Sequence, residues 1–305
     1  MVETNGETVT FPGARAPDRQ RWVDSQGVQI RVHEWGDEGA RPLMCVHGGF
    51  DFARTFDAFA PLLADAGWRV VAWDHRGHGD SEHAALYSWE ADVRDAMAVI
   101  DSTTREPVPV IAHSKGGSML LTIAEIFPHR LWRFVNIDGM PSPKRHLDVQ
   151  GHERTLQMEQ GIKSWIEHRR KVADAIRKPG TIDELAKRRG RMNPRLSHDW
   201  LRYLVTVGAR HDVDGWRWKI DPAMRFGGFG PWRHTWAMAA LPAVSVPLLG
   251  LLGLIPEEMG WGTQPGQLEP YLPSTAKIVY FSDTGHFVHI EKSREVADHV
   301  LDFLS

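Results

Sequence analysis

The sequence lacks the features that are typical of disulfide-bonded, membrane-spanning and metal-binding proteins. It has a single cysteine, Cys45, so no disulfide can form within the chain, and the apolar run around this residue predicts a buried thiol. No apolar stretch approaches the roughly 20 residues of a membrane span. Neither an H-E-x-x-H motif nor a cluster of Cys and His at metal-ligand spacing is present. We therefore expect a protein that needs no membrane, no catalytic metal and no cofactor.

Charge and the N-terminal segment narrow the class further. The 305 residues carry a formal net charge of -3, which gives no general reason to expect nucleic acid or an acidic membrane as a partner. Residues 1–21 lack the apolar core of a secretory signal and are rich in Gly, Pro, Thr and Glu, so we expect a flexible N-terminal tail. The default expectation is a cytoplasmic protein with a small-molecule partner, and the sequence leaves the oligomeric state open.

Strand and helix patterns alternate from Trp22 onward. Short apolar runs predict strands at residues 22–25, 28–35, 43–46, 69–73, 108–112, 134–137, 246–254 and 276–281. Periodic apolar positions predict helices at residues 56–66, after Ser88, at 116–127 and at 294–304. Such alternation predicts an α/β fold, a mostly parallel sheet with helices on both faces.

Residues 140–236 interrupt this alternation. They are polar, helical in pattern and rich in tryptophan, so we expect a helical cap inserted into a core of residues 22–139 and 237–305. The cap carries 20 Lys and Arg against 11 Asp and Glu, a net charge of +9, whereas the rest of the chain has a net charge of -12. The asymmetry indicates either a positive rim that attracts an anionic substrate or cap helices with solvated basic faces, and we favour the second interpretation.

The most informative motif is Ala-His-Ser-Lys-Gly-Gly at residues 112–117. It lies between a predicted buried strand and a predicted buried helix, where a serine occupies a sharp bend that lifts its hydroxyl clear of the sheet. Strand and helix backbones approach closely at such a bend, and the small side chains of Ala112 and Gly116 meet that need. The motif therefore predicts Ser114 as a nucleophile, because an ordinary helix N-cap would not explain the small neighbours.

Three further motifs also follow predicted strands. They are His47-Gly48-Gly49, the run DHRGHGDS at residues 74–81, and Gly285-His286-Phe287. Together with Ser114, in this order, they resemble the α/β-hydrolase superfamily, in its branch with a serine nucleophile and a helical cap. The resemblance covers about residues 22–139 and 240–305, and it departs from the family pattern at Ala112, where the family has glycine.

The resemblance implies roles for single residues. Ser114 would attack a carbonyl carbon, and His286 would accept the serine proton. The backbone N–H groups of Gly49 and Lys115 would form the oxyanion hole, with Phe50 as a neighbouring candidate donor.

The acid that orients the histidine stays open. Many relatives carry an aspartate after the seventh strand, but Pro256 occupies the matching position here. Glu257 or Glu258 could substitute if that loop is displaced. The other known place is the end of the sixth strand, where this chain has Asp138, 24 residues after the nucleophile. We favour Asp138 and keep the glutamate pair as the alternative.

Charged side chains beside the motifs have structural explanations. Asp74 and Arg76 can hold their turn together by charge-assisted hydrogen bonds, so this turn is expected to be architectural. The Lys115 side chain is expected to be solvated or structurally paired, although it could instead pair with an acidic group of a substrate or with a carboxylate of the cap.

Several side chains are candidates for a substrate pocket. Large aromatic rings in a cap can line an apolar pocket, and they can equally pack the cap onto the core. The candidates are Phe50 and His113 near the predicted nucleophile, and Trp216, Trp218, Trp232 and Trp236 in the cap.

Three classes of function are compatible with these residues. The first, which we favour, is a serine hydrolase that cleaves a carboxylic ester, thioester or lactone of a small hydrophobic substrate through an acyl-enzyme. The second keeps the fold for C–C bond hydrolysis, a lyase reaction or a cofactor-free reaction. The third is a non-catalytic ligand-binding protein, favoured only if the orienting acid is absent in space. Serine at the bend argues against dehalogenase and epoxide hydrolase chemistry, because those relatives use an aspartate there.

Overall fold

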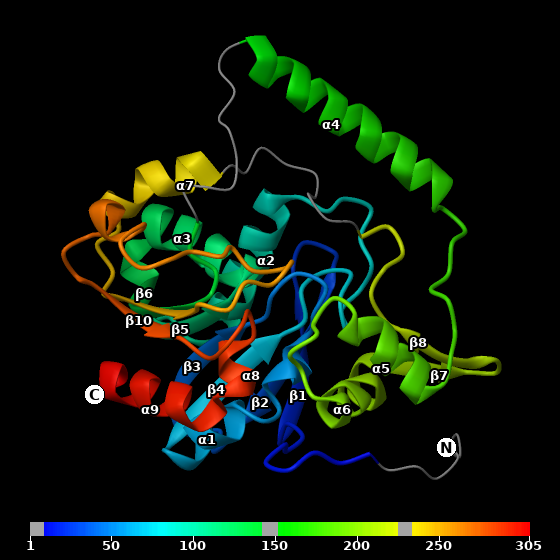
Figure 1. Cartoon of the computed structure of the whole chain (residues 1–305), viewed down its shortest axis with the longest axis horizontal. Helices are drawn as coiled ribbons and strands as arrows, with labels where there is room; N and C mark the ends of the chain where they lie inside the picture. The colour runs from blue at the N-terminus through cyan, green and yellow to red at the C-terminus, as the bar shows by residue number, and fades with distance from the viewer. Residues whose placement is uncertain (1–8, 142–151, 225–233) are drawn as a thin grey trace.

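The computed structural model describes residues 9–141, 152–224 and 234–305. Its centre is an eight-stranded sheet with the order β1-β2-β4-β3-β5-β6-β9-β10 (Figure 1). β2 runs antiparallel to both of its neighbours, and every other neighbouring pair from β4 to β10 is parallel. The mostly parallel α/β sheet predicted from the sequence is confirmed.

The strands of this sheet are β1 (Arg19–Asp24), β2 (Gln29–Trp35), β3 (Arg41–Val46), β4 (Trp68–Trp73), β5 (Val108–His113), β6 (Leu131–Ile137), β9 (Leu248–Gly253) and β10 (Ala276–Phe281). The helices outside the cap are α1 (Ala60–Asp65), α2 (Trp89–Thr103), α3 (Lys115–Ile126), α7 (His234–Ala240), α8 (Val288–Glu291) and α9 (Ser293–Leu304). Each predicted strand has a counterpart in this order.

Two apolar layers enclose the sheet, one on each face. On one face, α2, α3 and α7 pack against the strands through residues such as Val99, Leu120 and Met238. On the other face, α1 and α9 do so through residues such as Leu63 and Val300. Cys45 is fully buried in this second layer, as the sequence predicts, and burial raises the pKa of its thiol.

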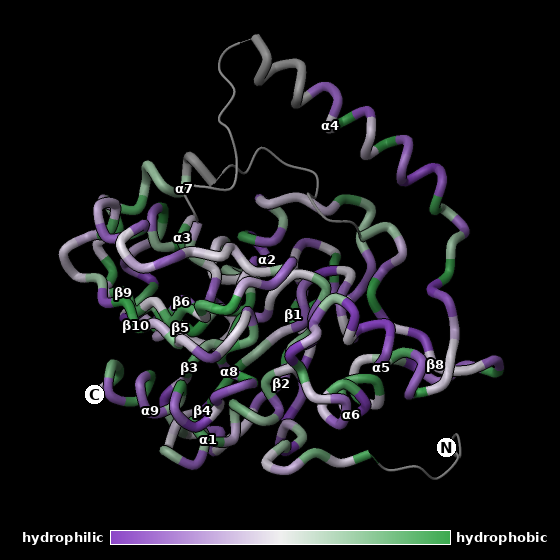
Figure 2. Tube along the Cα trace, in the orientation of Figure 1, coloured by the Kyte–Doolittle hydropathy of each residue, from purple (hydrophilic) through white to green (hydrophobic). Residues whose placement is uncertain are grey.

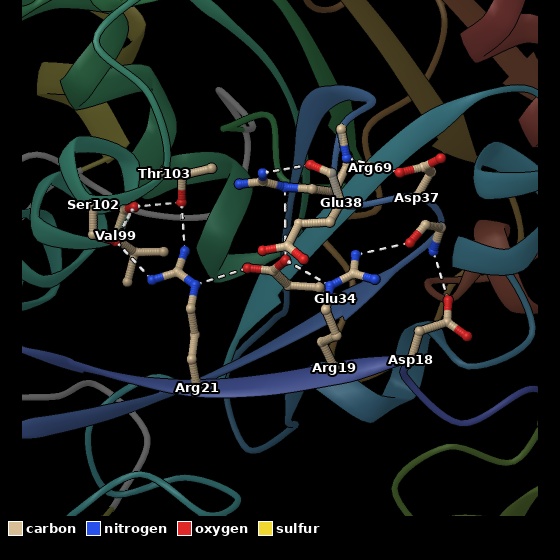
Figure 3. A network of polar contacts seen from close by, with 12 residues as sticks. Asp18, Arg19, Arg21, Glu34, Asp37, Glu38, Arg69, Val99, Ser102 and Thr103 are labelled. Atoms are coloured by element: carbon tan, nitrogen blue, oxygen red, sulfur yellow. Dashed lines mark hydrogen bonds and ion pairs between the residues drawn. The ribbon is translucent and has the colours of Figure 1, made fainter.

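The N-terminal strand starts earlier than predicted. β1 begins at Arg19 rather than Trp22, so the predicted flexible tail of residues 1–21 is too long. Figure 3 shows the reason, a buried Glu34 on β2 surrounded by arginines. Arg21 Nε donates to its carboxylate at 2.7 Å, and the Nε atoms of Arg19 and Arg69 lie 3.6 Å from it. Leaving the Glu34 charge buried and unpaired would be costly, so these contacts fix β1 at the sheet edge.

The cap contains strands as well as helices. It consists of α4 (His152–Lys171), α5 (Ile182–Gly190), α6 (His198–Gly208) and an antiparallel pair, β7 (Ala209–Asp212) and β8 (Gly215–Trp218). The prediction of a purely helical insertion is therefore wrong at the hairpin. Figure 2 shows that α4 is largely hydrophilic along its coloured part. The predicted boundary at residue 236 falls inside α7, whose Met238 packs in the core.

The sheet order brings the predicted motifs together. β3, β5, β6, β9 and β10 are consecutive parallel strands, so their carboxyl ends meet at one edge of the sheet. The residues that follow these strands include Gly49, Ser114, Asp138, Glu257 and His286. Ligand sites in open α/β sheets lie at this edge.

Candidate active site

Ser114 occupies a strained bend between β5 and α3. Its backbone angles are φ 52° and ψ -120°, and its N–H donates to the carbonyl of Ile137 at 2.9 Å. Ser114 is half-buried. A Cβ on Gly116 would lie 2.7 Å from the carbonyl oxygen of His47, which explains the small residue after the bend. Strain of this kind concentrates at functional sites.

Ser114, His286 and Asp138 form a continuous hydrogen-bonded chain. His286 Nε2 lies 2.9 Å from Ser114 Oγ, and His286 Nδ1 lies 2.5 Å from Asp138 Oδ2. A carboxylate only accepts, so Nδ1 carries a proton and Nε2 is left to accept from the serine hydroxyl. His286 and Asp138 are 2% and 4% exposed, so this polar chain is withdrawn from bulk water.

The backbone after β6 aims Asp138 at the histidine. Asp138 has φ 44°, and its N–H donates to the carbonyl of Leu251 on the neighbouring β9 at 2.9 Å. A Cβ on Gly260 would lie 3.3 Å from Asp138 Oδ2 and 3.6 Å from the His286 ring. The glycine therefore lets the loop after β9 cover the carboxylate–imidazole pair closely.

The alternative acids contact other groups. Glu257 Oε2 accepts the backbone N–H of His286 at 2.5 Å. Glu258, the next residue, is exposed. Glu257 is thus bonded to the main chain of the histidine, whereas the imidazole Nδ1 is bonded to Asp138.

The two predicted oxyanion residues are neighbours in space. A Cβ on Gly49 would lie 3.8 Å from Cβ of Lys115, so the turn after β3 lies against the first residue of α3. Phe50 has φ 58°, and its N–H donates to His78 Nε2 at 3.3 Å. The Phe50 N–H is therefore already bonded to His78, and Gly49 is the stronger candidate for the oxyanion donor in this turn.

The fold and the site geometry agree with a family of known sequences. The family model described as "Serine aminopeptidase, S33" matches residues 39–220. The chain belongs to this family. It is thereby a member of the α/β-hydrolase superfamily, as the four motifs indicate.

Single relatives are more distant. A serine hydrolase-like protein of Danio rerio is 27% identical over 61% of this chain and 56% of its own length, so the match spans little more than half of that relative. An sn-1-specific diacylglycerol lipase of Mus musculus is 25% identical over 88% of this chain and 83% of its own. Among solved structures, the thioesterase domain from the curacin biosynthetic pathway has a TM-score of 0.75 at 22% identity, covering 93% of this chain and 99% of that one. The last similarity shows the shared α/β-hydrolase fold.

The charged residues around the hydrolase motifs are paired within the fold. Lys115 Nζ lies 2.6 Å from Asp92 on α2, so its partner is neither a substrate group nor a cap carboxylate. Burial raises the pKa of Asp92, but the opposing charge of Lys115 contributes to a net lowering. Arg76 binds Asp95, and Asp74 accepts backbone N–H groups. Both residues are therefore structural, but each acts through other partners and not through a contact between the two.

One group of side chains has the composition of a metal site. His33, Asp74 and Asp80 place ligand atoms within 4.8 Å of one another. However, Asp74 Oδ1 accepts the N–H of Ala53 at 2.7 Å, and Asp74 Oδ2 accepts the N–H of Asp80 at 2.8 Å. The carboxylate is therefore already used by the backbone, and the group is explained as part of the turn after β4.

His113 lies beneath the histidine loop rather than in an open pocket. It is 1% exposed, and its Nε2 donates to the carbonyl of His286 at 2.9 Å. Its ring also lies 4.7 Å from that of His289, which is fully buried. Burial lowers the pKa of both rings, to about 3 for His289. This support role was not predicted from the sequence, although the apolar run before Ser114 indicates a buried position for His113.

Of the predicted pocket tryptophans, Trp216 and Trp218 have described side chains, and both lie on β8. Trp218 is half-buried, its ring centroid lies 6.3 Å from that of Phe52, and it lines a cavity of about 330 Å³. Ser114 is not among the residues lining that cavity. Trp216 packs against His211 within the cap hairpin, with ring centroids 5.1 Å apart. Trp232 and the Trp236 side chain lie outside the described residues, so their predicted pocket role stays a prediction.

Within residues 9–141, 152–224 and 234–305, no helix combines the length and apolar character needed to cross a membrane. The expected cytoplasmic location stays a prediction.

Proposed function

We propose that the protein is a serine hydrolase that cleaves a carboxylic ester, thioester or lactone of a small hydrophobic substrate. The observation that carries the proposal is the chain of contacts from Ser114 Oγ through His286 to Asp138, at 2.9 and 2.5 Å. A serine hydroxyl is a weak nucleophile until a base accepts its proton and a third group orients that base. These three residues meet that requirement.

The reaction proceeds in two halves. Ser114 Oγ attacks the carbonyl carbon while His286 Nε2 takes its proton, and the carbonyl oxygen becomes an oxyanion that accepts from the amides of Gly49 and Lys115. Asp138 stabilises the imidazolium, which then gives its proton to the leaving alcohol or thiol as the acyl-enzyme forms. Water repeats the sequence on the acyl-enzyme, releases the acid and restores the Ser114 hydroxyl.

The names of two similar proteins support this choice of bond. One is a diacylglycerol lipase and the other is a thioesterase domain, and both names refer to the cleavage of ester or thioester bonds. The low identity of both leaves the substrate itself to be identified by experiment. We therefore propose the bond class and the small-molecule substrate.

The test is labelling of Ser114 with a fluorophosphonate probe, read by mass spectrometry. Ser114→Ala should abolish labelling, and Asp138→Asn should slow it by about 10³–10⁴-fold because the imidazole loses the correct tautomer. Glu257→Gln is the matched control and should have the smaller effect, since Glu257 binds a backbone N–H. Equal slowing of the labelling by Asp138→Asn and Glu257→Gln would mean that Asp138 is not the residue that orients His286. No reaction of folded wild-type protein would contradict the hydrolase proposal and favour a non-catalytic binding protein.

A further inference from the structure

Two arginines of the cap reach the two loops that carry the proposed catalytic groups. We propose that Arg189 and Arg195 are positioning residues, and that Arg189 holds the loop of Gly49 and Phe50 while Arg195 holds the loop of His286. The inference rests on the proposed function, because both arginines act through the groups assigned there. Neither residue is argued to touch the substrate.

Arg189 lies near the end of α5 and joins the cap to the loop after β3. Its Nη1 donates to the carbonyl of Phe50 at 2.8 Å, and its Nη2 donates to Oδ1 of Asp51 at 3.1 Å. Its Nε donates to Oδ1 of Asn193 at 3.0 Å, which ties the same guanidinium to the cap. The Arg189 and Asp51 side chains are 11% and 1% exposed, so the pair is largely withdrawn from water. A guanidinium is suited to such a forked contact in a way that a lysine is not.

The loop that Arg189 holds has a conformation that needs external support. Phe50 lies at φ 58°, in the left-handed region that disfavours residues other than glycine. Such a conformation persists where surrounding contacts over-determine it. On the amide side of Phe50, His78 accepts the N–H, and on the carbonyl side Arg189 donates to the oxygen. The two contacts fix the backbone next to Gly49, the proposed oxyanion donor.

Arg195 lies in the connection between α5 and α6 and joins the cap to the loop after β10. Its Nε and Nη2 lie 2.8 and 2.7 Å from Glu291 Oε2, and Nη2 also donates to the carbonyl of Asp283 at 2.6 Å. The second oxygen of Glu291 accepts the N–H of Gly285 at 2.8 Å. Gly285 directly precedes His286, so the arginine is connected to the backbone of the proposed base through one carboxylate.

Glu257 also holds this loop, through the next amide along the chain. Its Oε2 accepts the N–H of His286 at 2.5 Å, so two consecutive amides of this loop are bonded to two carboxylates. A Cβ on Gly285 would lie 2.1 Å from Glu257 Oε2 and 2.6 Å from Cδ of Arg195. The glutamate and the arginine therefore both lie close against the same face of this glycine. Removing the arginine would remove one of the contacts that fix the backbone next to the imidazole.

A single short segment of the cap thus supports both halves of the site. Arg189 lies in the last turn of α5, and Arg195 lies six positions later in the connection to α6. Their positive charges face Asp51 and Glu291, which belong to the core. Part of the basic excess of the cap is therefore used to bind the acidic core rather than to attract a substrate.

The experiment compares Arg189→Met and Arg195→Met with the matched control Arg188→Met. Arg188 is also on α5, but it donates to the carbonyls of Lys178 and Pro179 inside the cap. The measurements are hydrolysis of p-nitrophenyl butyrate, the rate of fluorophosphonate labelling from pH 5 to pH 9, and hydrogen exchange of peptides covering residues 47–53 and 282–290.

For Arg189→Met we expect kcat to fall by about 10-fold or more with little change in KM, because the lost support acts on an oxyanion donor used in the transition state. The pH midpoint of labelling should stay in place, and exchange should rise at residues 47–53. Arg189→Lys should restore little of the rate, because it keeps the charge but not the fork.

For Arg195→Met we expect faster exchange at residues 282–290 and a fall in kcat with little change in KM, because the freed loop holds the imidazole less well in the geometry that the transition state needs. Arg195→Lys should restore little of the rate, because a lysine cannot bind Glu291 and the Asp283 carbonyl with the same forked geometry.

The possible results separate the two proposals. Variants that match Arg188→Met in rate, midpoint and exchange would overturn the positioning roles and leave the proposed function standing. Wild-type protein that does not react would overturn both. If a methionine variant does not fold, exchange and labelling of the corresponding lysine variant decide the same question.

Discussion

At the scale of single residues, buried charges hold the turns around the site. Asp74 accepts from the N–H groups of Ala53 and Asp80, so both of its oxygens are paired inside the fold. Arg76 binds Asp95 with two contacts of 2.6 Å, and the two side chains are 4% and 0% exposed. Removing only one partner of such a buried ion pair strongly destabilises the folded protein, because the other charge stays buried and unpaired.

Arg76→Met tests that statement. The variant leaves the Asp95 carboxylate buried without its partner, so we expect the free energy of unfolding to fall by about 3–5 kcal/mol. Urea unfolding measures the change. The double variant Arg76→Met/Asp95→Leu should recover most of the loss, because it removes the unpaired charge. An equal loss in the double variant would mean that packing, rather than charge, is responsible.

At the scale of elements, the site depends on how closely β5 and α3 approach β3. Besides the His47 oxygen, a Cβ on Gly116 would lie 2.9 Å from the carbonyl oxygen of Val46. A Cβ on Gly139 would lie 2.4 Å from the carbonyl of Ser114, so the end of β6 is equally close to the bend. The bend is therefore packed against backbone, which has little freedom to move aside.

Gly116→Ala should push the start of α3 away from the carbonyl groups at the end of β3, and this displacement should move Ser114. We expect a loss of about 1–3 kcal/mol in the free energy of unfolding, as for other overpacked sites, together with slower fluorophosphonate labelling. Gly161→Ala on α4 is the control, because nothing lies within 4 Å of its added Cβ. In a helix this change should stabilise by up to about 1 kcal/mol. Unchanged labelling of Gly116→Ala would show that the bend tolerates the displacement.

At the scale of the whole molecule, the core contains several buried histidines. His75, His78 and His289 are 0%, 1% and 0% exposed, and burial lowers their pKa values to about 4, about 3 and about 3. In the unfolded chain a histidine has its ordinary pKa of about 6.5. The unfolded state therefore binds more protons than the folded state between about pH 6.5 and pH 4, and stability falls as the pH falls through that window.

His289→Leu tests this pH dependence. Neither ring nitrogen of His289 has a hydrogen-bond partner among the described residues, so the substitution should cost little at pH 8. Between pH 6 and pH 4.5 the variant should lose stability less steeply than the wild type, by about 1.4 kcal/mol per pH unit. Urea unfolding at several pH values measures both slopes. The exposed residue His129 provides the control His129→Leu, and equal slopes in all three proteins would contradict the prediction.

Features that neighbouring residues encode could be predicted from the sequence alone. Alternating apolar runs predicted the sheet, because burial of parallel strands leaves that pattern in any such fold. Ser114 between small residues predicted the bend, because the steric requirement is local. The position of His286 after the last strand predicted its meeting with Ser114, because parallel strands end at one edge.

Contacts between residues far apart in the chain required the folded structure. The choice of Asp138 over Glu257 as the imidazole partner depends on the pairing of β6 with β9. In that pairing Ile137 lies opposite Leu251, 114 positions later, and composition does not encode such a contact. The starting point of β1 depends likewise on contacts with other elements, such as that of Arg21 with Glu34 on β2. The physical reason is that a sequence does not distinguish one Asp, Glu or Arg residue from another of the same type. The packed backbone determines which partner each of these side chains contacts.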